Sequence, residues 1–364
     1  MERFHDAGFT HPDRKRGRGA KSNASGRFET TARVAFDDGW SNLDEDPPPL
    51  RTEVQVDASR SIITSNNSPD IPFDQSINPY RGCEHGCIYC YARPTHAWLG
   101  LSPGLDFESR LFFKPNAAAL LEAELSNPRY QPKLIAIGTN TDPYQPIERK
   151  HEIMRGILEV LDKFRHPVGI TTKSCLVMRD IDILKRMAAR NQAKVFLSVT
   201  TLDRHLARKM EPRASTPGRR IDAIKALADA GIPVGMMVAP IVPGLTDHEI
   251  ESILEAGRAA GATEAGYVML RLPLEIKALF EEWLQEAAPL RAKRILDLVR
   301  GVREGQLNNM EWGKRMSGTG PYAALIAKRF EIAKRRLGFG DRTSGLDVSH
   351  FRRPPKAGDQ LSLF

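Results

Sequence analysis

Between about residues 105 and 270, short apolar runs alternate with segments whose apolar residues recur every three or four positions. The runs predict β-strands, and the periodic segments predict amphipathic helices between them. The expected strands cover residues 134–138, 168–173, 195–201, 232–240 and 264–272, and the expected helices cover 150–164, 180–190, 221–231 and a segment capped by Asp247. Five βα units in series predict an α/β fold with a parallel sheet covered by helices. The pattern does not say whether the sheet closes into a barrel.

The two ends of the chain lack this alternation. Residues 1–50 are rich in Gly, Ser, Asp and Arg, so we expect a disordered N-terminal extension, with a basic arm for nucleic acid as the alternative. Beyond residue 276, periodic segments at 277–304 and 321–336 predict helices, and a Gly/Pro/Arg-rich tail follows. We therefore expect a core domain over 69–275, a basic helical C-terminal extension over 276–340 and a flexible tail over 341–364.

Composition excludes several classes of protein. Hydrophobic residues make up 41% of the 364 positions, which suffices for a large core. No run of about 18 apolar residues occurs and no apolar signal segment opens the chain, so we expect no membrane partner and a cytoplasmic location. Of the four cysteines, Cys83, Cys87 and Cys90 lie within eight residues and Cys175 stands alone. This clustering excludes a disulfide-stapled extracellular scaffold.

The net charge of +8 is concentrated in the last quarter of the chain. Residues 276–364 contain 17 Lys and Arg against 10 Asp and Glu, a net charge of +7. Such asymmetry favours an anionic partner, nucleic acid first. A solvated face on a basic protein is the competing interpretation.

The segment NPYRGCEHGCIYCYAR carries the strongest chemical signal. Its cysteines, Cys83, Cys87 and Cys90, follow a C-x3-C-x2-C spacing just ahead of the predicted βα series. A structural zinc site needs four ligands, usually as two separated pairs, and here only His85 or His96 could complete one. A [4Fe–4S] cluster held by three thiolates leaves one iron open to a small molecule. We therefore favour the cluster over zinc.

This spacing, with an aromatic residue before the last cysteine, resembles the radical S-adenosylmethionine (SAM) superfamily over roughly residues 75–275. The segments CIYCYAR, GTNTDPYQPIE, TTKS, SVTT, ARKMEPRAS and GIPVGMMVAPIVPGLTD resemble its spore photoproduct lyase-like branch. The resemblance implies a partial (β/α)6 barrel whose site lies at the strand ends. It also implies a [4Fe–4S] cluster whose open iron binds SAM, reductive cleavage of SAM to a 5′-deoxyadenosyl radical, and an electron donor such as flavodoxin or ferredoxin.

The resemblance also assigns roles to individual residues. It makes Cys83, Cys87 and Cys90 the iron ligands. The cofactor-binding residues that it implies are the backbone at Tyr89 for the adenine, Thr139 and Asp142 for the amino group, Lys173 and Ser198 for the carboxylate and ribose, and Glu211 and Arg213 as a polar wall. The plainer interpretations are a surface Lys173, a strand-end Ser198 and a structural ion pair between Glu211 and Arg213. Arg271 either reaches a phosphate or carboxylate of the substrate or pairs with Glu275.

One departure from the lyase concerns the hydrogen-atom donor. The resemblance implies a relay through a cysteine near GTNTD, helped by the tyrosine after the cluster loop, here Tyr91, which we take as the catalytic residue. No cysteine occurs between residues 91 and 174, and Thr139 stands where the donor should be. Because a hydroxyl is a much poorer hydrogen-atom donor than a thiol, we do not expect repair of spore photoproduct by that relay. Cys175 substitutes only if it points into the barrel, and an inert buried thiol is the alternative.

We therefore expect a cytoplasmic, lyase-like radical SAM enzyme that acts on DNA or a nucleic-acid-associated substrate, as in repair. One alternative is SAM chemistry on a protein or small metabolite, which salt-dependent DNA binding would distinguish. The other is a non-catalytic DNA-binding adaptor that holds a cluster or zinc and yields no 5′-deoxyadenosine.

The C-terminal residues suggest a protein partner. Gln360, Leu361, Ser362, Leu363 and Phe364 resemble the pentapeptide by which bacterial repair proteins and polymerases bind the replicative sliding clamp. Apolar residues after a Pro/Gly/Lys stretch have no core to join, so we expect them to enter a groove on a partner. The alternative is that the tail folds back onto the protein.

Overall fold

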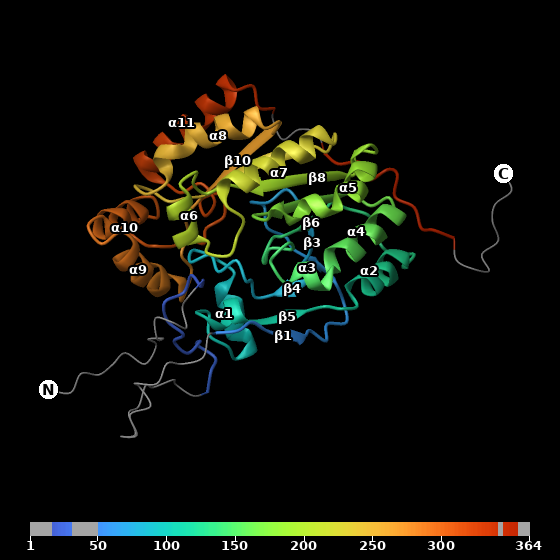
Figure 1. Ribbon diagram of the computed structural model, residues 1–364, viewed down its shortest axis with the longest axis horizontal. Coiled ribbons are helices and arrows are strands. Elements are labelled where there is room, and N and C mark those ends of the chain that lie inside the picture. Colours follow the sequence, from blue (N-terminus) through green and yellow to red (C-terminus); the bar gives the residue numbers. More distant parts are fainter. Residues whose placement is uncertain (1–16, 31–49, 341–344, 356–364) are drawn as a thin grey trace.

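A computed structural model of the protein describes residues 17–30, 50–340 and 345–355, and its centre is a seven-stranded sheet (Figure 1). The strand order is β10-β9-β8-β7-β6-β3-β2, and all neighbouring pairs are parallel except β2–β3. The strands are β2 (Ile63–Ser65), β3 (Gln75–Ile77), β6 (Ile135–Ile137), β7 (Val168–Thr172), β8 (Ala193–Ser198), β9 (Val234–Ile241) and β10 (Glu264–Met269). Six parallel strands confirm the predicted α/β class, and the sheet stays open, with β10 and β2 at its edges.

Helices cover the sheet, and further helices lie beside one end of it (Figure 1). The α-helices are α1 (Asp106–Ser109), α2 (Ala117–Ser126), α3 (Glu148–His151), α4 (Ile153–Lys163), α5 (Ile181–Ala188), α6 (Arg204–Met210), α7 (Pro217–Asp229), α8 (Ile250–Ala259), α9 (Ile276–Ala287), α10 (Ala292–Gly301) and α11 (Gly320–Arg336). The 3-10 helices are η2 (Arg93–Leu99), η3 (Cys175–Asp180) and η4 (Asp247–Glu249). Among the described residues, no helix combines the length and the apolar character that crossing a membrane requires.

The observed elements differ from the predicted ones in many places, since the prediction also omitted β2, α1, α2, α6 and the strands of a second sheet. Three of the differences have a clear physical reason. Strand β3 was missed because three residues are too few to show a period. The prediction that Asp247 caps a helix is wrong: Asp247 opens η4, and α8 begins only after Glu249. The predicted helix over 277–304 is two helices, α9 and α10, and Pro289 lies in the turn between them.

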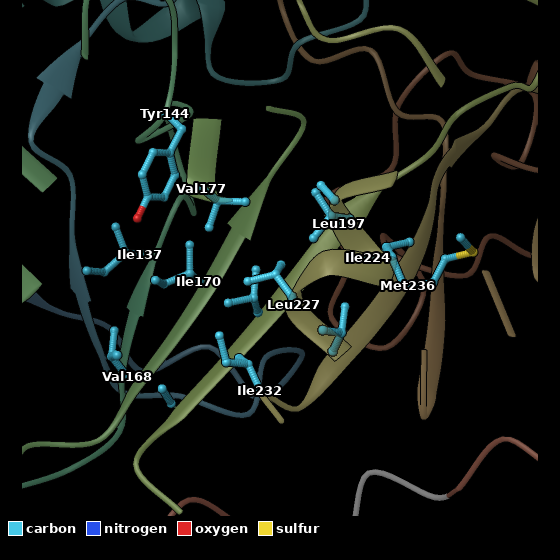
Figure 2. Close-up of a cluster of buried hydrophobic side chains, with 14 of the residues drawn as sticks. Ile137, Tyr144, Val168, Ile170, Val177, Leu197, Ile224, Leu227, Ile232 and Met236 are labelled. Carbon is cyan, nitrogen blue, oxygen red and sulfur yellow. The ribbon is translucent and has the colours of Figure 1, made fainter. Parts of the chain in front are cut away.

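The strands of the main sheet bury alternate side chains against the helices (Figure 2). In β7, Val168 and Ile170 are completely buried, whereas the intervening Gly169 and Thr171 are half-buried. Ile224 and Leu227 of α7 belong to the same buried cluster. Because side chains alternate across a strand, the core takes one face of the sheet and leaves the other face and the strand ends for polar groups.

A second, three-stranded sheet has the order β1-β5-β4, with β1 (Glu53–Val56), β5 (Arg110–Phe113) and β4 (Tyr80–Arg81). Strand β4 leads directly into the segment with the three cysteines. A second apolar cluster joins that segment, through Ile88, to Trp283 of α9 and Ile295 of α10. Helices α9 and α10 thus pack beside the cysteine segment.

The expected N-terminal extension is in part ordered. Residues 17–30 lie within the range predicted to be disordered, yet Ala20 is completely buried and Ser22 donates to Glu282 at 2.9 Å. The remainder of that range, residues 1–16 and 31–49, lies outside the described residues, as does the predicted clamp-binding peptide at 360–364.

Candidate functional site

The cysteine loop, residues 82–92, links β4 to η2. The backbone N–H of Cys83 donates to the carbonyl oxygen of Phe107 at 2.9 Å, which fixes the start of the loop. Gly82 adopts φ +75°, and a Cβ there would lie 2.9 Å from the same carbonyl oxygen, so glycine is needed at this turn. All three cysteines are free thiols; two of them are buried and the third is half-buried.

The three thiols are close enough to influence one another. Burial raises the pKa of all three thiols, and the neighbouring cysteines raise the pKa of Cys83 and Cys87 further. The Lys173 ammonium acts in the opposite direction on Cys87 and Cys90. Thiolates that are costly to form alone are stabilised when a metal takes up their charge, so this loop suits a metal or cluster.

Two histidines, His85 and His96, lie near the three cysteines. Among the described residues, no three His, Cys, Asp or Glu side chains converge as the ligands of one metal ion would. His85 Nδ1 faces Asp142 Oδ2 at 3.4 Å, and His96 Nε2 lies 2.8 Å from the Arg110 carbonyl oxygen. In a [4Fe–4S] cluster each thiolate binds a different iron, and three cysteines on one loop suit that arrangement.

A completely buried arginine, Arg93, supports the cysteine loop. Its guanidinium donates to the carbonyl oxygens of Gly86 at 3.1 Å and Cys87 at 2.9 Å. It also forms an ion pair with Glu108, which is completely buried as well. The sequence analysis missed both residues, because a buried pair fifteen residues apart leaves no local pattern.

The N-terminal segment, residues 17–26, crosses the same loop. The backbone N–H groups of Gly19 and Ala20 each donate to the Glu108 carboxylate at 2.8 Å. A Cβ at position 19 would lie 1.8 Å from the Gly86 carbonyl oxygen, so only glycine allows this approach. The buried carboxylate therefore ties the N-terminal segment to the cysteine loop.

Asp142, which follows β6, reaches the end of β7. Its carboxylate accepts from the Thr172 hydroxyl and from the backbone N–H of Lys173, both at 2.7 Å, and from the backbone N–H of Tyr144 at 2.9 Å. Burial raises the pKa of Asp142, but nearby His85 and these donors outweigh it and leave the pKa at about 2. Asp142 is therefore ionised and positions the backbone of Lys173.

Lys173 and Ser198 lie at the ends of the neighbouring strands β7 and β8. The Lys173 ammonium lies 5.8 Å from the centre of the Tyr89 ring, and no carboxylate of the described residues is within ion-pair distance of it. Ser198 is buried, and its carbonyl oxygen accepts from Arg220 at 2.8 Å. The Lys173 ammonium at the end of β7 thus lies beside the ring of Tyr89 on the cysteine loop.

Glu211 is the acceptor at the centre of a buried network. It accepts from the Tyr89 hydroxyl, from the Thr200 hydroxyl at 2.6 Å and from the guanidinium of Arg220. Burial raises the pKa of Glu211, but the charges of Arg220 and Lys173 outweigh it and leave the pKa at about 2. The network fixes the side chain of Tyr89, which lies between Cys87 and Cys90 in the sequence.

The structural ion pair considered between Glu211 and Arg213 is wrong. Glu211 pairs with Arg220, because Arg220 on α7 points back to the strand ends, whereas Arg213 Nη2 lies 3.1 Å from Glu84 Oε1 on the cysteine loop. The sequence Glu-Pro-Arg at 211–213 could not show these two pairs, because the partner of Glu211 comes from the following helix.

Tyr91 connects the cysteine loop to two strand ends. Its hydroxyl donates to the backbone carbonyl of Thr139, after β6, and the Arg271 guanidinium lies 4.4 Å from its ring centre, after β10. The alternative that Arg271 pairs with Glu275 is wrong, because Glu275 pairs with Arg27 at 2.8 Å.

Two other predicted positions have plainer surroundings. The Thr139 hydroxyl lies 3.5 Å from the side-chain nitrogen of Asn78. Cys175 opens η3, where its backbone N–H donates to the Ser215 hydroxyl at 2.9 Å, and its side chain packs against the main hydrophobic core. The structure therefore brings Tyr89, Lys173 and Glu211 together around the cysteine loop and leaves the Cys175 thiol with the core.

Comparison with known proteins places this site in a family. The profile of the radical SAM superfamily matches residues 77–257. An uncharacterized protein of Mycobacterium tuberculosis is 38% identical over 236 residues, which cover 64% of this chain and 69% of that protein. A Pseudomonas phage M6 protein named radical SAM Nα-GlyT isomerase is 26% identical over 62% of this chain and 46% of its own.

The fold is similar to that of spore photoproduct lyase. The structure of a mutant of that enzyme with bound AdoMet and dinucleoside spore photoproduct covers 78% of this chain and 77% of its own, with a TM-score of 0.54 and 17% identity. At this identity the likeness describes the fold.

Proposed function

This chain belongs to the radical SAM superfamily, and from that premise we propose that it cleaves SAM reductively in order to modify a nucleic acid. The observation that carries the proposal is the loop with Cys83, Cys87 and Cys90, which faces the ends of the parallel strands and a lysine that makes no ion pair with the described residues. When bound, a reduced [4Fe–4S] cluster would donate an electron to SAM, break its sulfonium C–S bond and release methionine and a 5′-deoxyadenosyl radical, which takes a hydrogen atom from the substrate.

The residues around the loop suit the binding of SAM. We assign Lys173 to the carboxylate, because its ammonium is the charged donor at the end of β7. Ser198 and the Tyr89 backbone contribute to the ribose and adenine end, and Thr139 to the amino group. Asp142 contributes by holding the backbone of Lys173, since its oxygens already accept three protein hydrogen bonds.

Glu211 and Arg213 form the polar wall of the site in different ways. Glu211 holds the Tyr89 hydroxyl through the network with Arg220, and Arg213 holds Glu84 on the cysteine loop. Both residues therefore position the loop on which SAM binding depends.

Tyr91 is the candidate catalytic residue. It stands at the strand ends beside Thr139, whose hydroxyl is a poor hydrogen-atom donor, and no cysteine lies there. We therefore propose that the hydrogen atom returns to the product by another route than a cysteine relay, or that SAM is consumed in each turnover.

Three observations support a nucleic-acid substrate. The net charge is +8, mostly in the C-terminal quarter of the sequence. The fold is similar to that of a lyase whose structure holds a dinucleoside photoproduct. The clamp-like peptide at 360–364 would bring the protein to DNA, and an electron donor such as flavodoxin or ferredoxin would act with it in the cytoplasm. If the substrate is instead a protein or a small metabolite, the positive charge has no part in substrate binding.

Anaerobic reconstitution with iron and sulfide tests the proposal. We expect about four irons per chain and, after reduction, formation of 5′-deoxyadenosine from SAM. Cys83→Ala, Cys87→Ala and Cys90→Ala should each lose the cluster absorbance and SAM cleavage, while Cys175→Ala should keep both. A full cluster in any of the first three variants, or stoichiometric zinc without iron uptake, would contradict the assignment.

A further inference from the structure

Arg271 carries a positive charge that the fold does not neutralise. Among the residues that the structure describes, its guanidinium has no carboxylate or carbonyl partner and contacts only the face of the Tyr91 ring, at 4.4 Å. Burial and the charge of nearby Arg315 lower the pKa of Arg271, although Tyr91, the Asp70 carboxylate and Cys90 act in the opposite direction. A half-buried guanidinium that makes no ion pair with a described residue is available to bind an anion, and its planar donors suit a phosphate. The position, at the end of β10 and next to Tyr91, lies at the proposed reaction site.

A loop formed by residues 307–316 runs beside Arg271. The backbone N–H of Leu272 donates to Leu307 at 3.1 Å, and the backbone N–H of Met269 donates to Met316 at 2.8 Å. These bonds attach both ends of the loop to the end of β10. Both ends of the loop are therefore held beside the segment that contains Arg271.

Two further groups hold the 307–316 loop in place. Buried Arg303 donates to the carbonyl oxygens of Lys314 at 3.1 Å and Arg315 at 2.9 Å, and also to those of Met269 and Leu270. Asp70 accepts from the backbone N–H of Gly313 at 2.6 Å and forms an ion pair with Arg315. Asp70 thus pairs directly with Arg315, whereas no carboxylate of the described residues forms an ion pair with Arg271.

The same loop presents large apolar side chains to solvent. Trp312 is 57% exposed and Met310 is 69% exposed. Exposed apolar side chains on an anchored loop beside a cation suit a ligand with a flat apolar face next to an anionic group. A nucleotide has such a face next to an anionic phosphate, and a base stacked on an aromatic side chain is the usual mode for unpaired nucleotides.

We propose that Arg271 and the 307–316 loop form the substrate site for unpaired nucleotides, in which Arg271 binds a backbone phosphate and Trp312 stacks against a base. The inference rests on the proposed function, because the reaction site defines which phosphate lies near Tyr91. A base unstacked from its duplex would reach the strand ends by the same contacts.

Fluorescence anisotropy of the reconstituted full-length protein tests the site. The probe is a labelled single-stranded oligothymidylate of about 12 nucleotides. Arg271→Gln should weaken binding about tenfold and reduce the slope of log affinity against log salt by about one. Trp312→Ala should weaken binding roughly 5- to 100-fold, and Trp312→Phe should restore most of it.

Lys225→Gln serves as the matched control, because Lys225 lies on the outer helix α7 and pairs with Asp229. It removes one charge and should leave the affinity unchanged. A methylphosphonate oligonucleotide, whose backbone is uncharged, and a polyglutamate peptide should both bind weakly. Equal binding of either one, or wild-type affinity in both Arg271→Gln and Trp312→Ala, would overturn the inference. If Arg271→Gln does not fold, the Trp312 variants and the uncharged oligonucleotide decide.

The proposed function is tested separately, by 5′-deoxyadenosine formation in the wild-type protein without oligonucleotide. Cleavage of SAM without the expected binding pattern would refute the nucleotide site and keep the proposed function. The expected binding pattern without SAM cleavage would refute the proposed function and keep the nucleotide site.

Discussion

Arg93 and Glu108 form an ion pair in which both side chains are completely buried, directly against the cysteine loop. The pair holds two carbonyl oxygens of the loop on the arginine side and two backbone N–H groups of the N-terminal segment on the glutamate side. Arg93 also donates to the carbonyl oxygens of Pro103 at 3.1 Å and Gly104 at 2.9 Å, so the pair joins the loop, the crossing segment and the turn at 103–104.

Glu108→Gln should destabilise the protein strongly, because it leaves the Arg93 guanidinium buried without its counter-charge. Removal of one partner of a buried pair costs about 3–5 kcal/mol. Urea unfolding of the iron-free protein measures the loss. Asp229→Asn, which removes the partner of the exposed Lys225, should cost less than about 1 kcal/mol. Equal stability of the two variants would contradict the role of the buried pair.

Gly19→Ala should displace the N-terminal segment from the cysteine loop, since a Cβ there would lie 1.8 Å from the Gly86 carbonyl oxygen. We expect faster proteolysis within residues 17–30 and faster loss of iron in air, because the loop becomes exposed. Gly218→Ala is the control, as a Cβ at that position meets no atom within 4 Å. Unchanged protease resistance in Gly19→Ala would show that the segment does not depend on this contact.

Lys173→Ala and Ser198→Ala should each weaken SAM binding without removing iron, because both residues lie at strand ends and not among the thiols. The loss of a charged hydrogen bond corresponds to roughly 10- to 100-fold in affinity for Lys173→Ala. Equilibrium dialysis with labelled SAM measures the affinity, and Lys225→Ala provides the control. If both variants bind SAM like the wild type, the assignment of the cofactor site is wrong.

Glu211 should contribute to stability above its ordinary pKa and lose that contribution in acid. Its folded pKa, about 2, lies below the value of about 4.3 expected in an unfolded chain. The folded state therefore binds fewer protons, and stability falls as the pH drops from about 5 towards 2. Glu211→Gln should flatten this part of the pH profile in urea unfolding of the iron-free protein. A profile as steep as that of the wild type would refute the depressed pKa.

The clamp-like peptide can be tested apart from the enzyme. A synthetic peptide of residues 352–364 should bind bacterial sliding clamp at about micromolar strength, because few apolar anchors must offset the ordering of a flexible segment. The double substitution of Leu363→Ala with Phe364→Ala should abolish this binding and leave SAM cleavage intact in the full chain. Equal clamp binding by both full-length forms would refute the interpretation of the tail.

Local pattern was sufficient for the sheet and for the cysteine loop. The strands β6 to β10 appear as apolar runs because each is buried on the helix side, and Cys83, Cys87 and Cys90 lie within one short turn. Both signals extend over a few neighbouring residues. They fix the fold class and the family without reference to the rest of the chain.

The tertiary structure decided which distant side chains share the site. Glu211 pairs with Arg220 rather than Arg213. Residues 17–20 pack beside the cysteine loop, although the sequence predicts disorder for this segment. Arg271 faces Tyr91, although 180 residues separate them. A buried polar group is stable only when it has a hydrogen-bond or ion-pair partner. The packing of strand ends against loops determines which partner lies within reach of each of these groups.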